Sequence, residues 1–195
     1  MRSGSKIILN AVVFQAAWFA CVLGGANDLA LAGTLTVIGV IAMHLALAQR
    51  AMPEALLIAA ATAIGLVWES AVVASGLIRY TTGNLVPGLA PYWIVAMWAL
   101  FATSLNLSMA WLKGRPWLAA LAGAVGGPLA YLAGERLGGL EMSDPLLALG
   151  AQALGWAVLL PVLVRLATRL DGFAPAASTE SAPWSPVTQE VRPHV

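Results

Sequence analysis

The sequence places one carboxyl group, Glu69, deep inside an apolar stretch of the chain. Glu69 lies 15 residues beyond Glu54, or about 22 Å along a helix that starts at a membrane interface. A charge at the centre of a bilayer costs about 2.5–3.5 kcal/mol on insertion scales, so such a group needs a partner or a function. We expect Glu69 to be a catalytic proton donor or acceptor. The alternative is a structural carboxyl that holds helices together.

Two further polar residues are predicted to lie near this carboxyl. Tyr131 stands 15 residues beyond Pro116 and therefore reaches a similar depth in its own helix. Glu135 follows one helical turn later on the same face. Both are candidate catalytic residues that would assist Glu69. For Glu135 the alternative is an ion pair with the neighbouring Arg136 at the membrane interface.

A ligand site is predicted beside these residues, in the outer half of the membrane. Arg79 and Tyr80 follow the end of the helix that carries Glu69, and they can fold back over it. Gln152 and Trp156 lie one turn apart on the last apolar stretch. We take these four residues as candidate ligand-binding residues around a cavity, with Arg79 at its mouth to hold an anionic headgroup.

A second polar layer is predicted near the other membrane face. Asn10, His44 and Asn106 each fall within about a third of the bilayer from that side. A histidine there could shuttle protons or bind a metal, but no second ligand stands at a suitable spacing, so we expect a hydrogen-bonded structural residue. We predict no metal site and no cofactor, because the sequence has no motif for a nucleophile, a phosphate loop or a zinc site.

The composition requires that these residues be positioned by membrane-spanning helices. Hydrophobic residues make up 60% of the 195 residues, charged residues only 10%, and the mean hydropathy is +0.83. A water-exposed surface needs about a quarter of charged residues, which excludes secreted, ordinary cytosolic and nucleic-acid-binding proteins. The single Cys21 excludes an internal disulfide framework. We therefore predict an all-α integral membrane protein.

Six stretches are long and apolar enough to cross a bilayer as helices. They are residues 7–24, 29–49, 54–77, 91–112, 116–137 and 145–170. Together they predict one transmembrane domain over residues 1–170, with residues 78–90 as the only long loop. Three aromatic residues around the start of the fourth stretch are expected in an interfacial aromatic belt: Tyr92, Trp93 and Trp98.

The distribution of basic residues predicts the orientation. Eight of the ten Lys and Arg residues fall on the side that holds both termini, and only Arg79 and Arg136 fall on the other. The positive-inside rule then places both termini in the cytoplasm. Residues 171–195 are rich in Pro, Ser, Ala and Thr, which predicts a disordered cytoplasmic tail. Arg2 and Lys6 before an apolar run are also typical of a signal peptide, but polar residues interrupt that run.

Small residues repeat along the fifth span. Their spacing predicts close packing against another helix of the bundle, or a docking face for a homo- or hetero-oligomer. They are Gly126, Ala130, Gly134 and Gly138 at every fourth position, and Gly123 and Gly127 as a GxxxG pair.

Three stretches resemble a family of small bacterial inner-membrane proteins, domain of unknown function 2878. They are NAVVFQAAWFACVLG in the first span, WESAVVASGLIRY in the third, and the run from PYWIVAMWALFATSLNLSM through KGRPWLAALAGAVGGPLAYLAGERLG, which contains the GGPLAY motif. The resemblance covers residues 7–170 and implies a multi-pass protein of the bacterial inner membrane. It also implies a link to lipid chemistry, since genes of such proteins often neighbour those of enzymes that modify fatty acids.

A fainter likeness connects the chain to membrane carotenoid cyclases and hydratases. It rests on Trp68 and Glu69, followed by Gly76, Tyr80, Pro91 and Trp98. The acidic cluster of those cyclases is missing at Pro91-Tyr92-Trp93, so the likeness implies only an apolar acyl or isoprenoid ligand.

Taken together, these patterns predict a protein that binds or modifies an acyl or isoprenoid lipid. The partner we expect is a membrane lipid, and a nucleic acid is excluded by composition. Two alternatives stay open: a small proton-coupled lipid or metabolite transporter, and a non-catalytic partner subunit that docks through the fifth helix.

Overall fold

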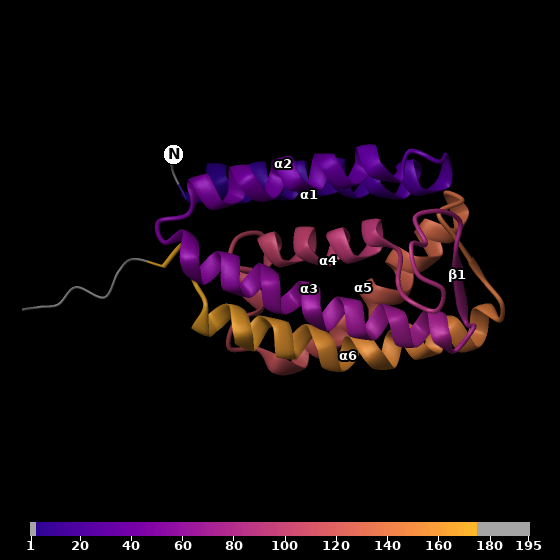
Figure 1. Cartoon of the computed structure of the whole chain (residues 1–195). Helices are drawn as coiled ribbons and strands as arrows, with labels where there is room; N and C mark the ends of the chain where they lie inside the picture. The colour runs from indigo at the N-terminus through magenta and orange to yellow at the C-terminus, as the bar shows by residue number, and fades with distance from the viewer. Residues whose placement is uncertain (1–2, 175–195) are drawn as a thin grey trace, which may run out of the picture.

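The apolar stretches of the chain form helices whose axes are roughly aligned with the long axis of one bundle, and helices that follow each other run in opposite directions (Figure 1). The computed structural model describes residues 3–174. Within them the helices are α1 (Ser3–Ala26), α2 (Ala30–Leu47), α3 (Ala51–Ala74), α4 (Tyr92–Leu105), α5 (Pro116–Arg136) and α6 (Pro145–Arg169), with a short 3-10 helix η1 (Ala110–Leu112). Five of them are long and apolar enough to cross a membrane. The predicted all-α membrane fold is thus confirmed.

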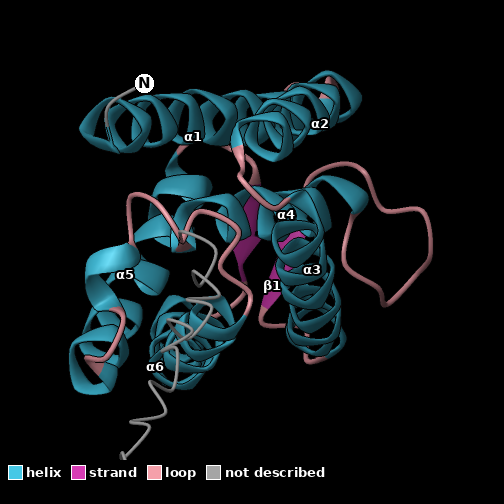
Figure 2. Ribbon diagram, turned by 90° about the vertical axis from the view of Figure 1, so that its left-hand side faces the viewer, coloured by secondary structure: helices cyan, strands magenta, loops and turns pink. Residues whose placement is uncertain are grey.

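The helix α4 differs from its predicted bounds. It ends at Leu105 after 14 residues, and turns and η1 complete the stretch that was expected to be helical up to Leu112. Four helices (α1, α2, α3 and α6) pack around α4, which lies in the centre of the bundle (Figure 2). A helix that contacts lipid needs about 20 residues to span the bilayer. A helix that is enclosed by other helices can be shorter, because its neighbours shield the ends of its backbone from lipid.

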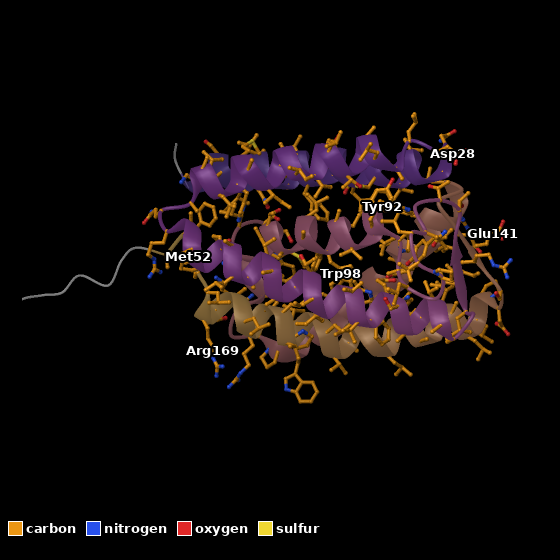
Figure 3. All side chains as sticks on the ribbon, viewed as in Figure 1. Asp28, Met52, Tyr92, Trp98, Glu141 and Arg169 are labelled. Carbon is orange, nitrogen blue, oxygen red and sulfur yellow. The ribbon has the colours of Figure 1, made fainter. Side chains whose placement is uncertain are left out.

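The two ends of the bundle carry different structures. The start of α1 and the end of α6 lie at one end, which we call the terminal end, and Met52 and Arg169 mark it (Figure 3). Asp28 and Glu141 mark the opposite end, which we call the strand end (Figure 3). There β1 (Ile78–Tyr80) pairs antiparallel with β2 (Leu140–Met142), in a segment that the sequence indicated only as a loop.

Glycines allow the helices of two hairpins to touch backbone to backbone. A Cβ atom on Gly123 would lie 2.1 Å from the carbonyl oxygen of Trp156, and one on Gly127 would lie 2.5 Å from its indole. Gly33 on α2 meets the backbone of Cys21 on α1 in the same way. The predicted close packing of the fifth span therefore joins α5 to α6 inside the bundle.

Replacing Gly123 by Leu should lower the stability of the bundle by about 3 kcal/mol, because the side chain must push α5 away from α6. Gly126 is the matched control, since its Cβ would meet no atom within 4 Å. Gly126→Leu should change stability by no more than about 0.5 kcal/mol. Thermal unfolding in detergent measures both variants, and equal stabilities would show that α5 does not depend on this contact.

Candidate functional site

The carboxyl group of Glu69 is fully buried and accepts hydrogen bonds from three aromatic side chains. The Tyr80 hydroxyl donates to Oε2 at 2.7 Å, and the Trp98 indole N–H donates to Oε1 at 3.0 Å. The Tyr131 hydroxyl also donates to Oε1. A carboxylate has about four acceptor positions, so three donors satisfy most of its demand without a charged partner.

Four different elements bring these side chains together. Glu69 comes from α3, Tyr80 from β1, Trp98 from α4 and Tyr131 from α5. Alternation along β1 turns Tyr80 inward, because neighbouring residues of a strand point to opposite faces. Gly65, one turn before Glu69, leaves the space for Trp98: a Cβ atom there would lie 2.1 Å from the indole.

A large apolar cavity lies next to this carboxyl. Its volume is about 850 Å³, which is in the upper part of the range for small-molecule sites. Glu69 and Tyr131 form part of its wall, whereas Tyr80 lies behind them. The other walls are mostly apolar and include Phe14 and Trp18 of α1, Met97 and Phe101 of α4, Leu129 of α5 and Trp156 of α6. The Trp98 and Trp156 rings stack at 4.8 Å between their centroids.

The cavity opens between α1 and α5. These helices belong to separate hairpins, α1 packing on α2 and α5 on α6, and they stand apart in the end view (Figure 2). Phe19 on α1 and Leu129 on α5 line the cavity and are also exposed on the surface of the bundle. Because this surface is apolar, the opening faces the lipid side of a membrane protein rather than one of its aqueous ends.

A second buried carboxyl, Glu54, lies at the terminal end of α3 and is also inaccessible to solvent. Its Oε2 lies 2.8 Å from Nε2 of His44. Its Oε1 accepts from the side-chain amide of Asn106 and from the backbone N–H of Gly172, both at 2.7 Å. The carboxyl therefore ties α2, α3, the end of α4 and the segment after α6 into one network.

The segment after α6 belongs to the folded bundle up to Ala174. Asp171 accepts from Lys113 at 2.6 Å and from the backbone amides of Phe173 and Ala174. Partial burial alone raises the pKa of Asp171, but these hydrogen bonds outweigh that effect and leave the pKa below its usual value. Asp171 is therefore ionised at neutral pH. The rest of the predicted tail, residues 175–195, lies outside the described residues.

Comparison with known proteins identifies the family. The family model with the description "Protein of unknown function (DUF2878)" matches residues 7–162. The chain belongs to this family. No curated protein and no solved structure matches it, and the likeness to carotenoid cyclases and hydratases finds no support in these comparisons.

The structure of this DUF2878 protein brings together part of the predicted site. Tyr131 and Tyr80 both contact Glu69, and Trp156 lines the cavity beside it. Gln152 is buried one turn away from Trp156, but it accepts from the Trp68 indole at 3.3 Å and does not line the cavity.

Two predicted site residues lie elsewhere. Glu135 accepts from the backbone N–H of Met142 at 3.1 Å and so holds β2; in the described part of the chain its side chain forms no ion pair with Arg136 and no hydrogen bond with Glu69. Arg79 stands opposite Glu141 in the strand pair and points to the exposed face of β1. Hence Arg79 is not at the mouth of the cavity.

The sequence interpretation missed four residues of these two sites. Trp98 and Trp93 are 4% and 1% exposed, so their assignment to an interfacial belt was wrong. Arg136 lines the cavity at the strand end, in the place where Arg79 was expected. Glu54 is the centre of the second polar layer, where Asn106 and His44 bind it and Asn10 instead accepts from the Ser108 hydroxyl at 2.7 Å.

The described residues contain no group of three His, Cys, Asp or Glu side chains that could hold a metal ion. Among the groups that line the cavity, the Glu69 carboxyl and the phenol of Tyr131 stand side by side and face an apolar space. Such a pair can hold a proton beside a bound molecule or move it to and from that molecule.

Glu54→Ala should destabilise the bundle by about 3 kcal/mol or more, because several buried donors lose their only shared acceptor. Glu54→Gln should recover most of this loss, since its oxygen can still accept from Asn106 and Gly172. Glu141→Ala, at an exposed carboxyl on β2, is the control and should leave the melting temperature in detergent unchanged. Equal melting temperatures for the two alanine variants would refute the role of Glu54.

Proposed function

We propose that this membrane protein binds a lipid with a long apolar chain in its cavity and uses Glu69 as an acid or base toward that chain. The observation that carries the proposal is the combination of a cavity of about 850 Å³, an almost wholly apolar wall and one carboxyl group in that wall. An apolar cavity of this size suits an acyl or isoprenoid chain, and the opening between α1 and α5 lets the chain enter from the bilayer.

The surroundings of Glu69 support a chemical role beyond binding. A protonated carboxyl in an apolar cavity is a proton donor with no water to compete for its proton. Tyr80 and Trp98 hold the carboxyl in place, and Tyr131 stands beside it in the cavity wall. We propose that the Glu69 acid protonates a double bond of the bound chain and that the resulting carboxylate takes a proton from the adjacent carbon, so that the double bond moves by one position and the acid is restored.

A second candidate function is a proton-coupled transporter, and one observation favours it. Glu54 and Glu69 are both buried on α3, 15 residues apart, and so lie at two depths of the bundle. Two carboxyls along one helix could bind a proton one after the other as it crosses the membrane. Against this, Glu54 is enclosed by its own network and does not line the cavity.

The location and partners that we propose follow from the same features. We propose the bacterial inner membrane, with both termini in the cytoplasm as the basic residues indicate. The partner is a membrane lipid. Gly126 and Ala130 of α5 face the cavity and its opening, which favours a lipid over a partner helix on this part of α5.

Filling the cavity should abolish lipid binding. Gly126→Trp places an indole in the open space beside Gly126, whereas Val125→Trp places the same side chain on the lipid-facing surface next to it. Mass spectrometry of lipids extracted from purified protein should show a specific lipid with the wild type and with Val125→Trp, but not with Gly126→Trp. The same extracted lipids from all three proteins would exclude the cavity as the binding site.

Glu69→Gln separates binding from chemistry. The Gln side chain can still accept from Trp98 and Tyr131 and can donate to the oxygen of Tyr80, so the protein should fold and retain its lipid. It cannot exchange a proton at neutral pH, so any change that the protein makes to cellular lipids should be lost.

Lipid profiles of cells that carry the wild type, Glu69→Gln or no gene measure this effect. An enzyme alters the lipid species, whereas a transporter alters only their distribution between the two leaflets. A Gln variant with full activity would leave Glu69 as a structural carboxyl.

A further inference from the structure

The cavity has a charge at only one of its ends. Among the described residues that line it, Glu69 and Arg136 are the only charged ones. Arg136 is the last residue of α5 and lies at the strand end, whereas the lining toward the terminal end consists of neutral residues such as Ser104, Ser108 and Met109. A molecule in this cavity therefore meets a cation at one end and none at the other.

Arg136 is exposed and has no ion-pair or hydrogen-bond partner among residues 3–174. The nearest carboxyl in the sequence, Glu135, is engaged by the backbone of Met142. The other acidic residue of this strand pair, Glu141, stands opposite Arg79. The guanidinium thus keeps all its donors free at the rim of an apolar cavity, and a planar guanidinium suits carboxylate and phosphate oxygens.

The positions along α5 relate this cation to the carboxyl of Glu69. Tyr131, which contacts Glu69, lies five residues before Arg136, or about 7 Å along the helix. Ala122, the first α5 residue that lines the cavity, lies nine residues before Tyr131, about 13 Å further on. The part of α5 that lines the cavity, from Ala122 to Arg136, is therefore longer than the hydrocarbon thickness of one leaflet, about 15 Å. An extended lipid chain fits along this length of the cavity.

We infer that the ligand is an anionic amphiphile, whose carboxylate or phosphate headgroup binds Arg136 while its apolar chain runs past Glu69 toward Ser104 and Ser108. This inference rests on the proposed function and narrows it to one class of lipid. Glu69 then faces the chain at some distance from the headgroup, and Arg136 is a specificity-determining residue.

A pair of probes that differ only in charge tests the inference: dibromostearate and its methyl ester. Bromine quenches the tryptophans of the cavity wall, and a Trp111→Phe/Trp117→Phe background removes two lipid-exposed indoles. In that background at alkaline pH, dibromostearate should bind about tenfold more tightly than the ester, the effect of one charge-assisted hydrogen bond. Arg136→Gln should abolish this preference and leave the affinity for the ester unchanged.

Arg79→Gln is the matched control, because Arg79 is also exposed at the strand end but does not line the cavity. It should keep the preference for the anionic probe. Equal affinities for both probes in the wild type would overturn the inference and leave the proposed apolar site standing, whereas failure of both probes to bind would overturn the proposed function itself. An Arg136→Gln variant that has a lower melting temperature but still prefers dibromostearate over the ester would also overturn the inference. Arg136 would then only stabilise the C-terminus of α5 through the helix dipole.

Discussion

The burial of the Glu69 carboxyl is the constraint on which most of the structure depends. Without donors, a carboxyl in an apolar interior costs several kcal/mol, and among residues 3–174 no Lys or Arg side chain pairs with this one. Its three donors come from three separate elements, each of which needs its own support. Tyr80 points inward only because β1 pairs with β2, and Trp98 fits only because Gly65 has no side chain. The pairing of β1 with β2 and the glycine at position 65 are thus both needed to supply the hydrogen-bond donors of the Glu69 carboxyl.

The two buried carboxyls of α3 are satisfied in different ways, and the difference indicates different roles. Glu54 is closed on all sides by His44, Asn106 and the backbone of Gly172, where a Cβ atom would lie 2.7 Å from the Glu54 side chain. Such a closed network fixes the ends of several helices and leaves no space for a ligand. Glu69 has comparable support on one side and the cavity on the other. An open side next to a well-held acid is expected where the acid acts on something else.

Helix geometry explains which parts of the site the sequence could predict. The rise per residue placed Glu69 and Tyr131 at one depth from their distances to Glu54 and Pro116, and the two side chains do meet. The same reasoning missed Trp98, because α4 is apolar on every face and its sequence has no periodicity that marks a buried side. It also missed the strand pair, since three residues are too few for an alternating pattern. Because the strand pairing was not predicted, the sequence could not show that Arg79 faces outward or that Arg136 lies at the cavity.

The cavity itself follows from how the helices pair. The glycines of α5 and α2 allow the two helices of each hairpin to pack very closely against each other. The glycine-bearing faces are therefore buried inside the hairpins, and little contact surface remains between α1 and α5. In water such a gap would collapse or fill with solvent, because protein interiors tolerate few voids larger than a water molecule. In a bilayer the surrounding medium consists of acyl chains, which can occupy an apolar gap without loss of hydrogen bonds. An open space between two hairpins is therefore compatible with a lipid environment, and under the proposed function the chains that fill it would lie against Glu69.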